Sequence, residues 1–326
     1  MSAENAEELE NIRVSYLGRK GQINRLTEEL KNKETEERKI VGRLLNDTKQ
    51  ALEDALTTRG QELTNSKRQE WFDPTVPGFV PERGHLHLIT QAIQEISGIF
   101  EKIGFTRVRY PEVDWDWFAF ESLNMPKEHA ARDEWETFFV DQPENAKYGK
   151  MVLTPHTSNG QPREMMRLKK PPIRMINIAK CYRRQSDVTH NPMFHQFEGL
   201  VIDRGINITH LKGTIDHFAK QFYGPKVVSR IRPFHFMFTE PSFEVDFSCI
   251  HCSGIGCRFC KSGWHEVGGA GMVHPNVLKA GGIDPNEYSG FAFGWGVERA
   301  QLLKPGIELD DIRTMYSSDI RYLRQF

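Results

Sequence analysis

The sequence predicts an α+β protein in which a mostly antiparallel sheet flanked by helices follows an N-terminal helical, coiled-coil arm. Up to about residue 70 the chain contains no proline and is rich in Glu, Lys, Arg, Leu and Ala, which are good helix formers. Farther on, short aromatic-rich runs with frequent Gly and Pro, such as residues 232–247 and 289–296, are typical of antiparallel strands. A length of 326 residues corresponds to about two domains.

The arm is expected to be a helical hairpin. After Val41 the apolar positions fall within a narrow arc at helical spacing, which predicts one long amphipathic helix: Leu45, Leu52, Leu56 and Leu63. Gly18 and Gly21 interrupt an earlier helical stretch, so the chain should fold back there. A projecting arm would present four basic residues to a polyanion: Arg13, Arg19, Lys20 and Arg25. The alternative is a helical bundle packed on the rest of the chain.

A linker separates the arm from the second domain. Residues 71–84 hold three prolines and two glycines and cannot continue a helix. We therefore predict an arm and linker over residues 1–79 and a second domain over residues 80–326. That domain should begin with a helix over residues 85–103, which Gly104 ends, followed by a strand over residues 105–113.

The net charge excludes a uniformly basic surface. Lys and Arg number 43 and Asp and Glu number 44, which gives −1 at pH 7. Local basic clusters on such a chain still allow nucleic-acid binding. No run approaches the roughly 20 apolar residues of a membrane span, and the first residues lack the pattern of a signal peptide. We expect a cytoplasmic protein without membrane contact.

Four of the five cysteines lie in one dodecapeptide and predict a zinc site. Cys249, Cys252, Cys257 and Cys260 form two CxxC pairs, and glycines between the pairs let the chain reverse. Four thiolates close a tetrahedron and leave no position for water, so the zinc would be structural. Uncoordinated thiols, pairwise disulfides, or His251 as a ligand are the alternatives, and Cys181 is left over.

Three stretches interleave polar and aromatic residues: residues 153–161, 181–199 and 290–299. Alone, each is compatible with surface ion pairs or core aromatics. The third is not a dinucleotide fingerprint, because its third position is Arg and no βαβ pattern surrounds it. Their order is more informative, since an aromatic-arginine strand and loop precedes, by about a hundred residues, a glycine-rich strand that enters a helix at Glu298 and Arg299.

This order resembles motifs 2 and 3 of class II aminoacyl-tRNA synthetases, with motif 1 around Gly104 and Pro111. The chain is similar, nearly end to end from about residue 10, to the alpha subunits of bacterial phenylalanine–tRNA ligases. The segments that carry this similarity are HTS with Gln161, YRR, THNPMFHQFEGL, FMFTEPS, GAGMVHPNVL and YSGFAFGWGVER. VSYLGRKGQINRL is similar to that family's N-terminal coiled-coil arm, which is usually longer at its amino end. The resemblance implies the class II antiparallel sheet and ATP-dependent charging of tRNA(Phe) with L-phenylalanine, in an alpha2beta2 heterotetramer with a beta subunit.

The resemblance also implies roles for the nucleotide residues. Arg183 matches the motif 2 arginine that bridges the α-phosphate and the substrate carboxylate. Arg299 matches the motif 3 arginine that packs against adenine and reaches the γ-phosphate. Phe194 would cover the other adenine face, and His190 would approach the phosphates. A guanidinium suits both arginine roles, because it stays charged, binds oxygens through two N–H groups and stacks on rings.

For phenylalanine, Phe236 and Phe238 alternate and are expected on one face of a strand, with Ala292 as the floor of the slot. The residues that match the surroundings of the substrate amino group are His156, Ser158, Gln161, Gln196 and Glu198, with Glu198 as counter-charge. An ordinary aromatic core would explain the two phenylalanines, but not Gln196 and Glu198 on one strand.

Glu240 matches a glutamate that the family uses for Mg²⁺, shared with the beta subunit, although other acidic residues of the chain would serve equally well. Some family members lack the two CxxC pairs, so zinc is not essential to the chemistry. Departures from the commonest pattern are Gln185, where motif 2 usually has an acid, and Asn159, Gly160 and Trp295. The alternative functions are a related enzyme that adenylates another small acid and a catalytically silent, zinc-bearing nucleic-acid-binding module.

Overall fold

The computed structural model of the chain describes residues 3–32, 34–65, 73–78, 81, 83–129, 132, 137–186, 190–257, 260–307 and 311–325. Its contacts divide the chain into two units, residues 1–82 and 83–326, where the sequence places the boundary near residue 80. The described residues between 66 and 84 contain no helix or strand. Among the described helices, none is long and apolar enough to cross a membrane.

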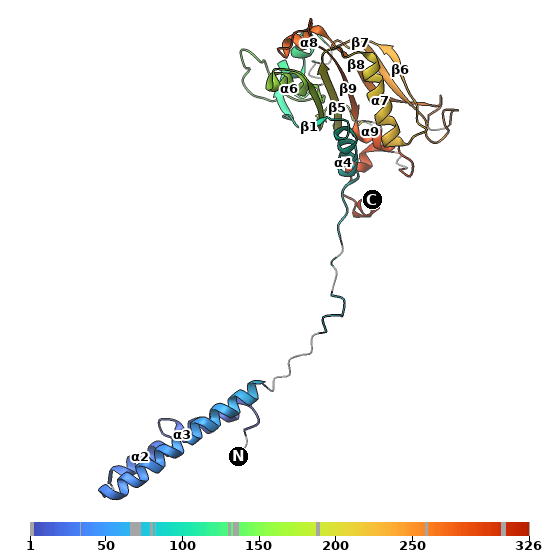
Figure 1. The fold of residues 1–326 in the computed structure, drawn as a ribbon. Coiled ribbons are helices and arrows are strands. Elements are labelled where there is room, and N and C mark those ends of the chain that lie inside the picture. Colours follow the sequence, from blue (N-terminus) through green and yellow to red (C-terminus); the bar gives the residue numbers. More distant parts are fainter. Residues whose placement is uncertain are drawn as a thin grey trace. The chain divides into compact units, whose positions relative to one another are not determined.

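The first unit is a helical hairpin (Figure 1). Its helices are α1 (Ala6–Leu17), α2 (Gln22–Glu29), the 3-10 turn η1 (Leu30–Asn32) and α3 (Thr35–Asn65). Gly18 and Gly21 separate α1 from α2, as predicted, but both helices contact α3, so the chain reverses between η1 and α3 rather than at these glycines. The N-terminal end is held by Arg59 of α3, whose Nε and Nη2 donate to the carbonyl of Ala3 at 3.1 and 3.0 Å.

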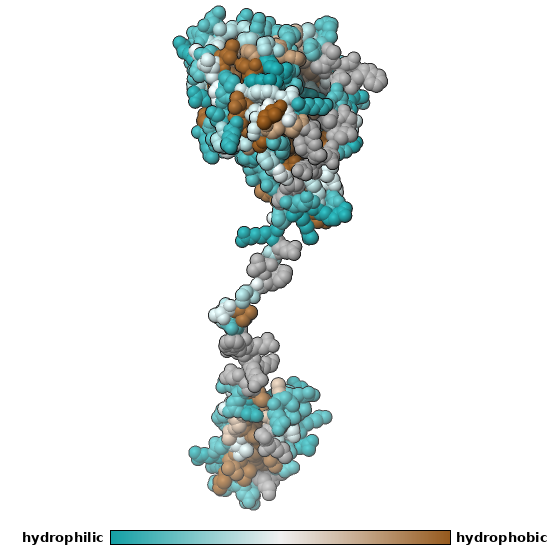
Figure 2. Space-filling model, turned by 90° about the vertical axis from the view of Figure 1, so that its right-hand side faces the viewer, coloured by the Kyte–Doolittle hydropathy of each residue, from teal (hydrophilic) through white to brown (hydrophobic). Residues whose placement is uncertain are grey.

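This unit buries few side chains. Ala3 and Ile23 are buried among its described residues, whereas several large apolar side chains are exposed and gather toward one end (Figure 2): Leu26, Ile40, Val41 and Leu44. Of the predicted basic residues, Arg13 forms an ion pair with Glu10 at 2.7 Å, and the other three are exposed. The arm therefore presents both charge and apolar surface.

The second unit is built on a seven-stranded sheet. Its order is β1 (Thr106–Val108), β4 (Ile173–Tyr182), β5 (Met193–Asp203), β9 (Ser289–Gly296), β8 (Trp264–Val273), β7 (Thr239–Ser248) and β6 (Ser229–Phe234). All neighbouring pairs are antiparallel except β1 and β4. The predicted α+β class with a mostly antiparallel sheet is confirmed.

Helices cover both faces of this sheet. On one face lie α4 (Leu88–Glu101), α7 (Ile208–Tyr223) and α9 (Val297–Leu302), which enclose a core rich in aromatic residues, with Phe100, Phe197, Phe218 and Trp295 almost fully buried (Figure 1). A second apolar cluster includes residues of α6 (Gly160–Leu168) and α8 (Pro275–Ala280). The remaining described elements are short: β2 (Val113–Trp115), α5 (Asp116–Ala119), η2 (Glu121–Leu123), β3 (Met151–Leu153), η4 (Thr157–Asn159), η5 (Ile312–Tyr316) and α10 (Ile320–Leu323).

Two strand predictions were wrong in detail. The strand expected over residues 105–113 is split into β1, in the main sheet, and β2, which pairs with β3. Pro111 lies between them, and proline cannot donate a ladder hydrogen bond. Phe236 and Phe238 lie in the turn between β6 and β7 rather than on a strand. There the Phe236 N–H donates to the Ser242 hydroxyl at 3.0 Å, which helps close the turn.

Candidate active site

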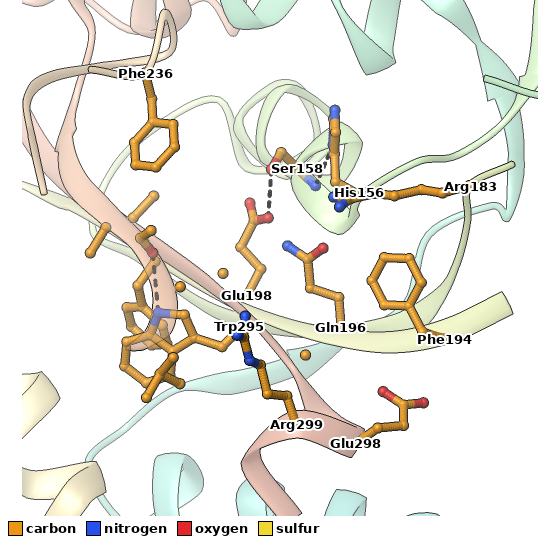
Figure 3. Close-up of a pocket in the computed structure, with 18 of the residues that line it drawn as sticks. His156, Ser158, Arg183, Phe194, Gln196, Glu198, Phe236, Trp295, Glu298 and Arg299 are labelled. Atoms are coloured by element: carbon orange, nitrogen blue, oxygen red, sulfur yellow. Dashed lines mark hydrogen bonds between the residues drawn. The ribbon is translucent and has the colours of Figure 1, made fainter. Parts of the chain in front are cut away.

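A pocket of about 770 Å³ lies over the middle of the sheet. It is lined by residues of β5, β8 and β9, by the segments around residues 156–161 and 183–191, and by the β6–β7 turn. The structure brings together here every residue that the sequence assigns to ATP or phenylalanine: His156, Ser158, Gln161, Arg183, His190, Phe194, Gln196, Glu198, Phe236, Phe238, Ala292 and Arg299. Figure 3 shows Glu198 between Phe236 on one side and Phe194 on the other.

Strand β5 supplies the polar floor through its alternation. Phe194, Gln196 and Glu198 line the pocket, whereas Phe197 belongs to the helix-covered core. On the neighbouring strand Gly294 lies opposite Glu198, and a Cβ at Gly294 would come within 2.6 Å of Gln196 Nε2. The lack of a side chain at Gly294 therefore leaves room for the side chains of Gln196 and Glu198.

The carboxylate of Glu198 accepts three side-chain hydrogen bonds in the pocket. Only 2% of the residue is exposed. Its Oε2 accepts from Ser158 Oγ at 2.6 Å and Thr157 Oγ1 at 3.0 Å, and its Oε1 accepts from Gln161 Nε2 at 2.7 Å. Burial raises the pKa of Glu198 to about 7, although the three donors oppose this shift. A cation placed here would favour the carboxylate form.

His156 stands at the start of this donor segment. Its Nδ1 accepts from the Ser158 N–H at 3.3 Å and caps η4, and its ring meets Phe120 edge to face at 6.2 Å. Burial, aided by the positive charge of Arg183, lowers the pKa of His156 to about 4. The imidazole is therefore neutral near pH 7 and does not repel a cationic group in the pocket.

The apolar end is a narrow aromatic slot. The rings of Phe236 and Phe238 stack at 5.4 Å with an angle of 15° between their planes. Phe236 lies over Gly269 of β8, where a Cβ would come within 2.7 Å of the ring. Ala292 of β9 is 4% exposed and also lines the pocket. Such a slot accommodates one flat apolar ring.

The cationic end carries two arginines. Arg183 follows β4, and its Nε donates to the Pro155 carbonyl at 3.1 Å while its guanidinium lies 5.1 Å from the Phe194 ring centre. Arg299 lies in the first turn of α9 directly after β9, which places it beside the glycine-rich strand. His190 and Gln185 are exposed at the pocket mouth. This end can bind phosphate oxygens and a flat base.

Several pocket contributors were not identified as site residues from the sequence. Thr157 lies inside the HTS segment, and its donation to Glu198 was not anticipated. Glu298 lines the pocket next to Arg299, and Ile312 reaches it from η5. Trp295, a departure from the commonest pattern, is 1% exposed and donates from Nε1 to the Gly269 carbonyl at 3.1 Å, joining β9 to β8. No pattern in the sequence points to Ile312.

Glu240 does not line this pocket. It lies on β7, its side chain is 73% exposed, and one carboxylate oxygen is 3.3 Å from His274 Nε2. The carboxylate predicted to hold Mg²⁺ is therefore not among the groups that line the pocket, although the preceding residue, Thr239, is.

The four clustered cysteines meet at the tip of the β7–β8 hairpin. Their sulfurs all lie within 4.8 Å of one another, with Cys249–Cys257 at 3.9 Å, and Cys252–Cys260 and Cys257–Cys260 at 3.5 Å. Zinc–sulfur bonds of about 2.3 Å in a tetrahedron require sulfur separations of about 3.8 Å. Backbone N–H groups of Gly256 and Gly263 donate to the sulfurs of Cys252 and Cys260 at 3.2 Å. In the described part of the chain no cysteine forms a disulfide.

Replacing Cys252 by serine is expected to abolish zinc binding and to lower the melting temperature, because a closed four-thiolate site contributes directly to folding. The cluster shares no residue with the pocket, so KM values for pocket ligands should stay unchanged. Metal analysis and thermal melts of the purified chain measure both effects, and Ser262→Ala in the same loop is the control. Unchanged metal content in the Cys252 variant would contradict the zinc assignment.

Comparisons with known proteins identify relatives of both units. Residues 71–326 match the family "tRNA synthetases class II core domain (F)", and residues 4–71 match "Aminoacyl tRNA synthetase class II, N-terminal domain". The chain is 46% identical to the phenylalanine–tRNA ligase alpha subunit of Clostridium kluyveri, over 98% of this chain and 93% of that one. It is also 46% identical to the corresponding subunits of Pseudomonas fluorescens and Moorella thermoacetica, over 100% of this chain and 95% of each.

Among solved structures, the chain resembles pyrrolysyl-tRNA synthetase from Desulfitobacterium hafniense, with a TM-score of 0.53 and 16% identity over 84% of each chain. At this identity the likeness concerns the fold alone, and it agrees with the antiparallel sheet and flanking helices described above.

Proposed function

Because the chain belongs to the family of phenylalanine–tRNA ligase alpha subunits, we propose that its pocket joins ATP and L-phenylalanine into phenylalanyl-adenylate and then transfers phenylalanine to tRNA(Phe). The products are diphosphate in the first step and AMP in the second. The observation that carries the proposal is a single pocket with a buried carboxylate, an aromatic slot and two arginines. The two alternative functions are not favoured by relatives at this identity.

Phenylalanine is bound at its two ends. Its ammonium group meets Glu198, which Ser158, Thr157 and Gln161 hold in place, while Gln196 lines the same floor. The substrate ring enters the slot formed by Phe236, Phe238 and Ala292. A charged anchor at one end and an aromatic slot at the other select an amino acid with a flat apolar side chain.

Adenylate formation needs alignment and charge stabilisation rather than a base. The carboxylate of phenylalanine is already ionised when it attacks the α-phosphorus, and diphosphate leaves. Arg183 binds the α-phosphate and the attacking carboxylate, and Arg299 binds the γ-phosphate and one adenine face. Phe194 covers the other face, and His190 approaches the phosphates from the pocket mouth. The contacts of Arg183 with Pro155 and Phe194 support its assigned position.

Metal ions have two assigned places. Class II synthetases use Mg²⁺ with ATP, where the ion neutralises phosphate charge. We assign Glu240 to Mg²⁺ together with the beta subunit, since its carboxylate is exposed, and no step above depends on it. The four cysteines are assigned to a structural Zn²⁺, which their sulfur separations support.

The chain is assigned to an alpha2beta2 heterotetramer in the cytoplasm, with editing on the beta subunit. The helical arm is assigned to tRNA binding, supported by the exposed Arg19, Lys20 and Arg25. Phenylalanine-dependent exchange of labelled pyrophosphate into ATP, with the chain alone and with its beta subunit, tests the proposal. Exchange with another amino acid alone, or with none under either condition, would overturn it.

Replacing Ala292 by glycine is expected to admit para-substituted phenylalanines, because it removes a methyl group from the slot. One methylene in an apolar pocket changes discrimination by about 10–200-fold, so kcat/KM for 4-chlorophenylalanine should rise at least about tenfold relative to phenylalanine. Pyrophosphate exchange with both substrates measures it. The control is Ala219→Gly on α7, because Ala219 belongs to the helix-covered core and does not line the pocket. No gain over the parent chain would contradict the slot assignment.

A further inference from the structure

The carboxylate of Glu298 contacts both His195 and Tyr316 beside the nucleotide end of the pocket. The residue is 1% exposed, and its Oε1 accepts from the His195 backbone N–H at 2.7 Å. The same oxygen lies 3.0 Å from His195 Nδ1 and accepts a hydrogen bond from the Tyr316 hydroxyl. His195 Nδ1 and the Tyr316 hydroxyl are themselves 2.9 Å apart. Residues of β5, α9 and η5 therefore meet on one buried carboxylate oxygen.

Each of the three segments that meet at Glu298 also contributes residues to the pocket. His195 lies on β5 between Phe194 and Gln196, which both line the pocket. Glu298 directly precedes Arg299 on α9. Tyr316 ends η5, whose first residue, Ile312, also lines the pocket. Figure 3 shows Phe194, Glu298 and Arg299 at the same end of the pocket.

The C-terminal segment is anchored from a second side. His87 Nε2 lies 2.7 Å from the carbonyl oxygen of Met315. The rings of His87 and His195 both stack with the Tyr316 ring, each at a centroid distance of 6.2 Å. Met315 is fully buried in the main core. The segment is thus fixed against the sheet rather than lying loosely over it.

We propose that Glu298 is a positioning residue that sets the separation of Phe194 and Arg299, and that η5 completes the nucleotide subsite through Tyr316 and Ile312. The inference rests on the proposed function, which places adenine between Phe194 and Arg299. Glu298 does not itself touch the reacting atoms. It joins the strand that carries one adenine contact to the helix that carries the other, and the hydroxyl of Tyr316 fixes the carboxylate.

The burial of this carboxylate supports such a role. A buried charge is costly unless hydrogen bonds compensate it. Here the His195 N–H and the Tyr316 hydroxyl donate to Oε1, whereas Oε2 is buried without a hydrogen-bond partner among the described residues. A buried carboxylate of this kind adds little to the free energy of unfolding. It restricts the geometry of the groups that it joins, since moving any of them leaves a buried charge less well paired.

The test is Tyr316→Phe in the chain assembled with its beta subunit. Loss of a hydrogen bond to a charged group should raise KM for ATP in pyrophosphate exchange about tenfold or more, with KM for phenylalanine unchanged. The matched control is Tyr110→Phe, because Tyr110 also donates to a buried glutamate, Glu164, and neither residue lines the pocket. The control should leave both KM values unchanged.

Two further variants test the same contact between Glu298 and Tyr316. Glu298→Gln should raise KM for ATP as well, and the double variant with Tyr316→Phe should lose less than the product of the two single effects, because both act through one contact. An unchanged KM for ATP in Tyr316→Phe, or equal increases in both KM values, would overturn the inference. Failure of the parent complex to exchange pyrophosphate with phenylalanine would instead overturn the proposed function, so the two failures are distinguishable.

Discussion

Replacing Arg183 by alanine is expected to lower kcat/KM for phenylalanine-dependent pyrophosphate exchange by about 10²–10³. In the reaction the α-phosphate and the attacking carboxylate are both anions, and they must approach each other within the pocket. A guanidinium between them offsets their repulsion and aligns the attack, so its removal acts on the transition state more than on binding of either substrate.

Lysine at position 183 should restore only part of this activity. The ammonium group keeps the charge, but it cannot bind two oxygens through paired N–H groups or lie flat on the Phe194 ring. Arg184→Ala is the matched control, since the guanidinium of Arg184 lies over Phe138, 5.1 Å from the ring centre, and outside the pocket lining. Equal losses in the Arg183 and Arg184 variants would contradict the assigned role.

Replacing Glu198 by glutamine is expected to raise KM for phenylalanine by about 10²–10³, because removing one partner of a buried charge pair costs about 2–5 kcal/mol. The side chain keeps its size, but glutamine cannot neutralise the substrate ammonium. Its amide would also bring N–H groups toward Ser158, Thr157 and Gln161, which donate to this position. KM for ATP should change little. Glu164→Gln, a buried glutamate outside the pocket lining, is the control.

The same carboxylate should make phenylalanine binding pH-dependent. The pKa of Glu198 is raised to about 7 by burial, and the substrate ammonium binds its deprotonated form. Affinity is therefore full well above pH 7 and falls as the pH decreases through 7, approaching tenfold per pH unit. KM for phenylalanine measured between about pH 5.5 and 8 checks this, and the profile of Glu198→Gln should be flat. A sloping profile in the glutamine variant would assign the titration to another group.

Much of the fold follows from local sequence signals. The proline-free, Leu-spaced segment is the long helix α3, and the aromatic alternation over residues 289–296 is β9. The strand over residues 105–113 was wrong because the alternation continues through Pro111, although the chain changes sheets there. Alternation in the sequence shows which residues share a face of a strand. It does not show that residues 106–108 pair with β4 whereas residues 113–115 pair with β3.

The site was predictable where its residues are adjacent in sequence. The HTS segment and the alternation of Gln196 with Glu198 both indicate polar side chains aimed in one direction, and the structure has them meet. The positions of Phe236 and Phe238 were predicted on a strand, but a turn presents them instead. The contact of Glu298 with Tyr316 joins residues of two segments, and no local pattern reports such a contact.

The strand order also bears on how the chain is synthesised. β9 is the last strand in the sequence, yet it lies between β5 and β8 in the sheet. Until it is made, β1, β4 and β5 form one part and β6, β7 and β8 another, each with an unpaired inner edge that can pair with other chains. Arg299 and η5 follow later still. A growing polypeptide therefore remains inactive and prone to aggregation until nearly its whole length has left the ribosome. Truncation near the C-terminus should impair folding of the sheet more than loss of the helical arm does.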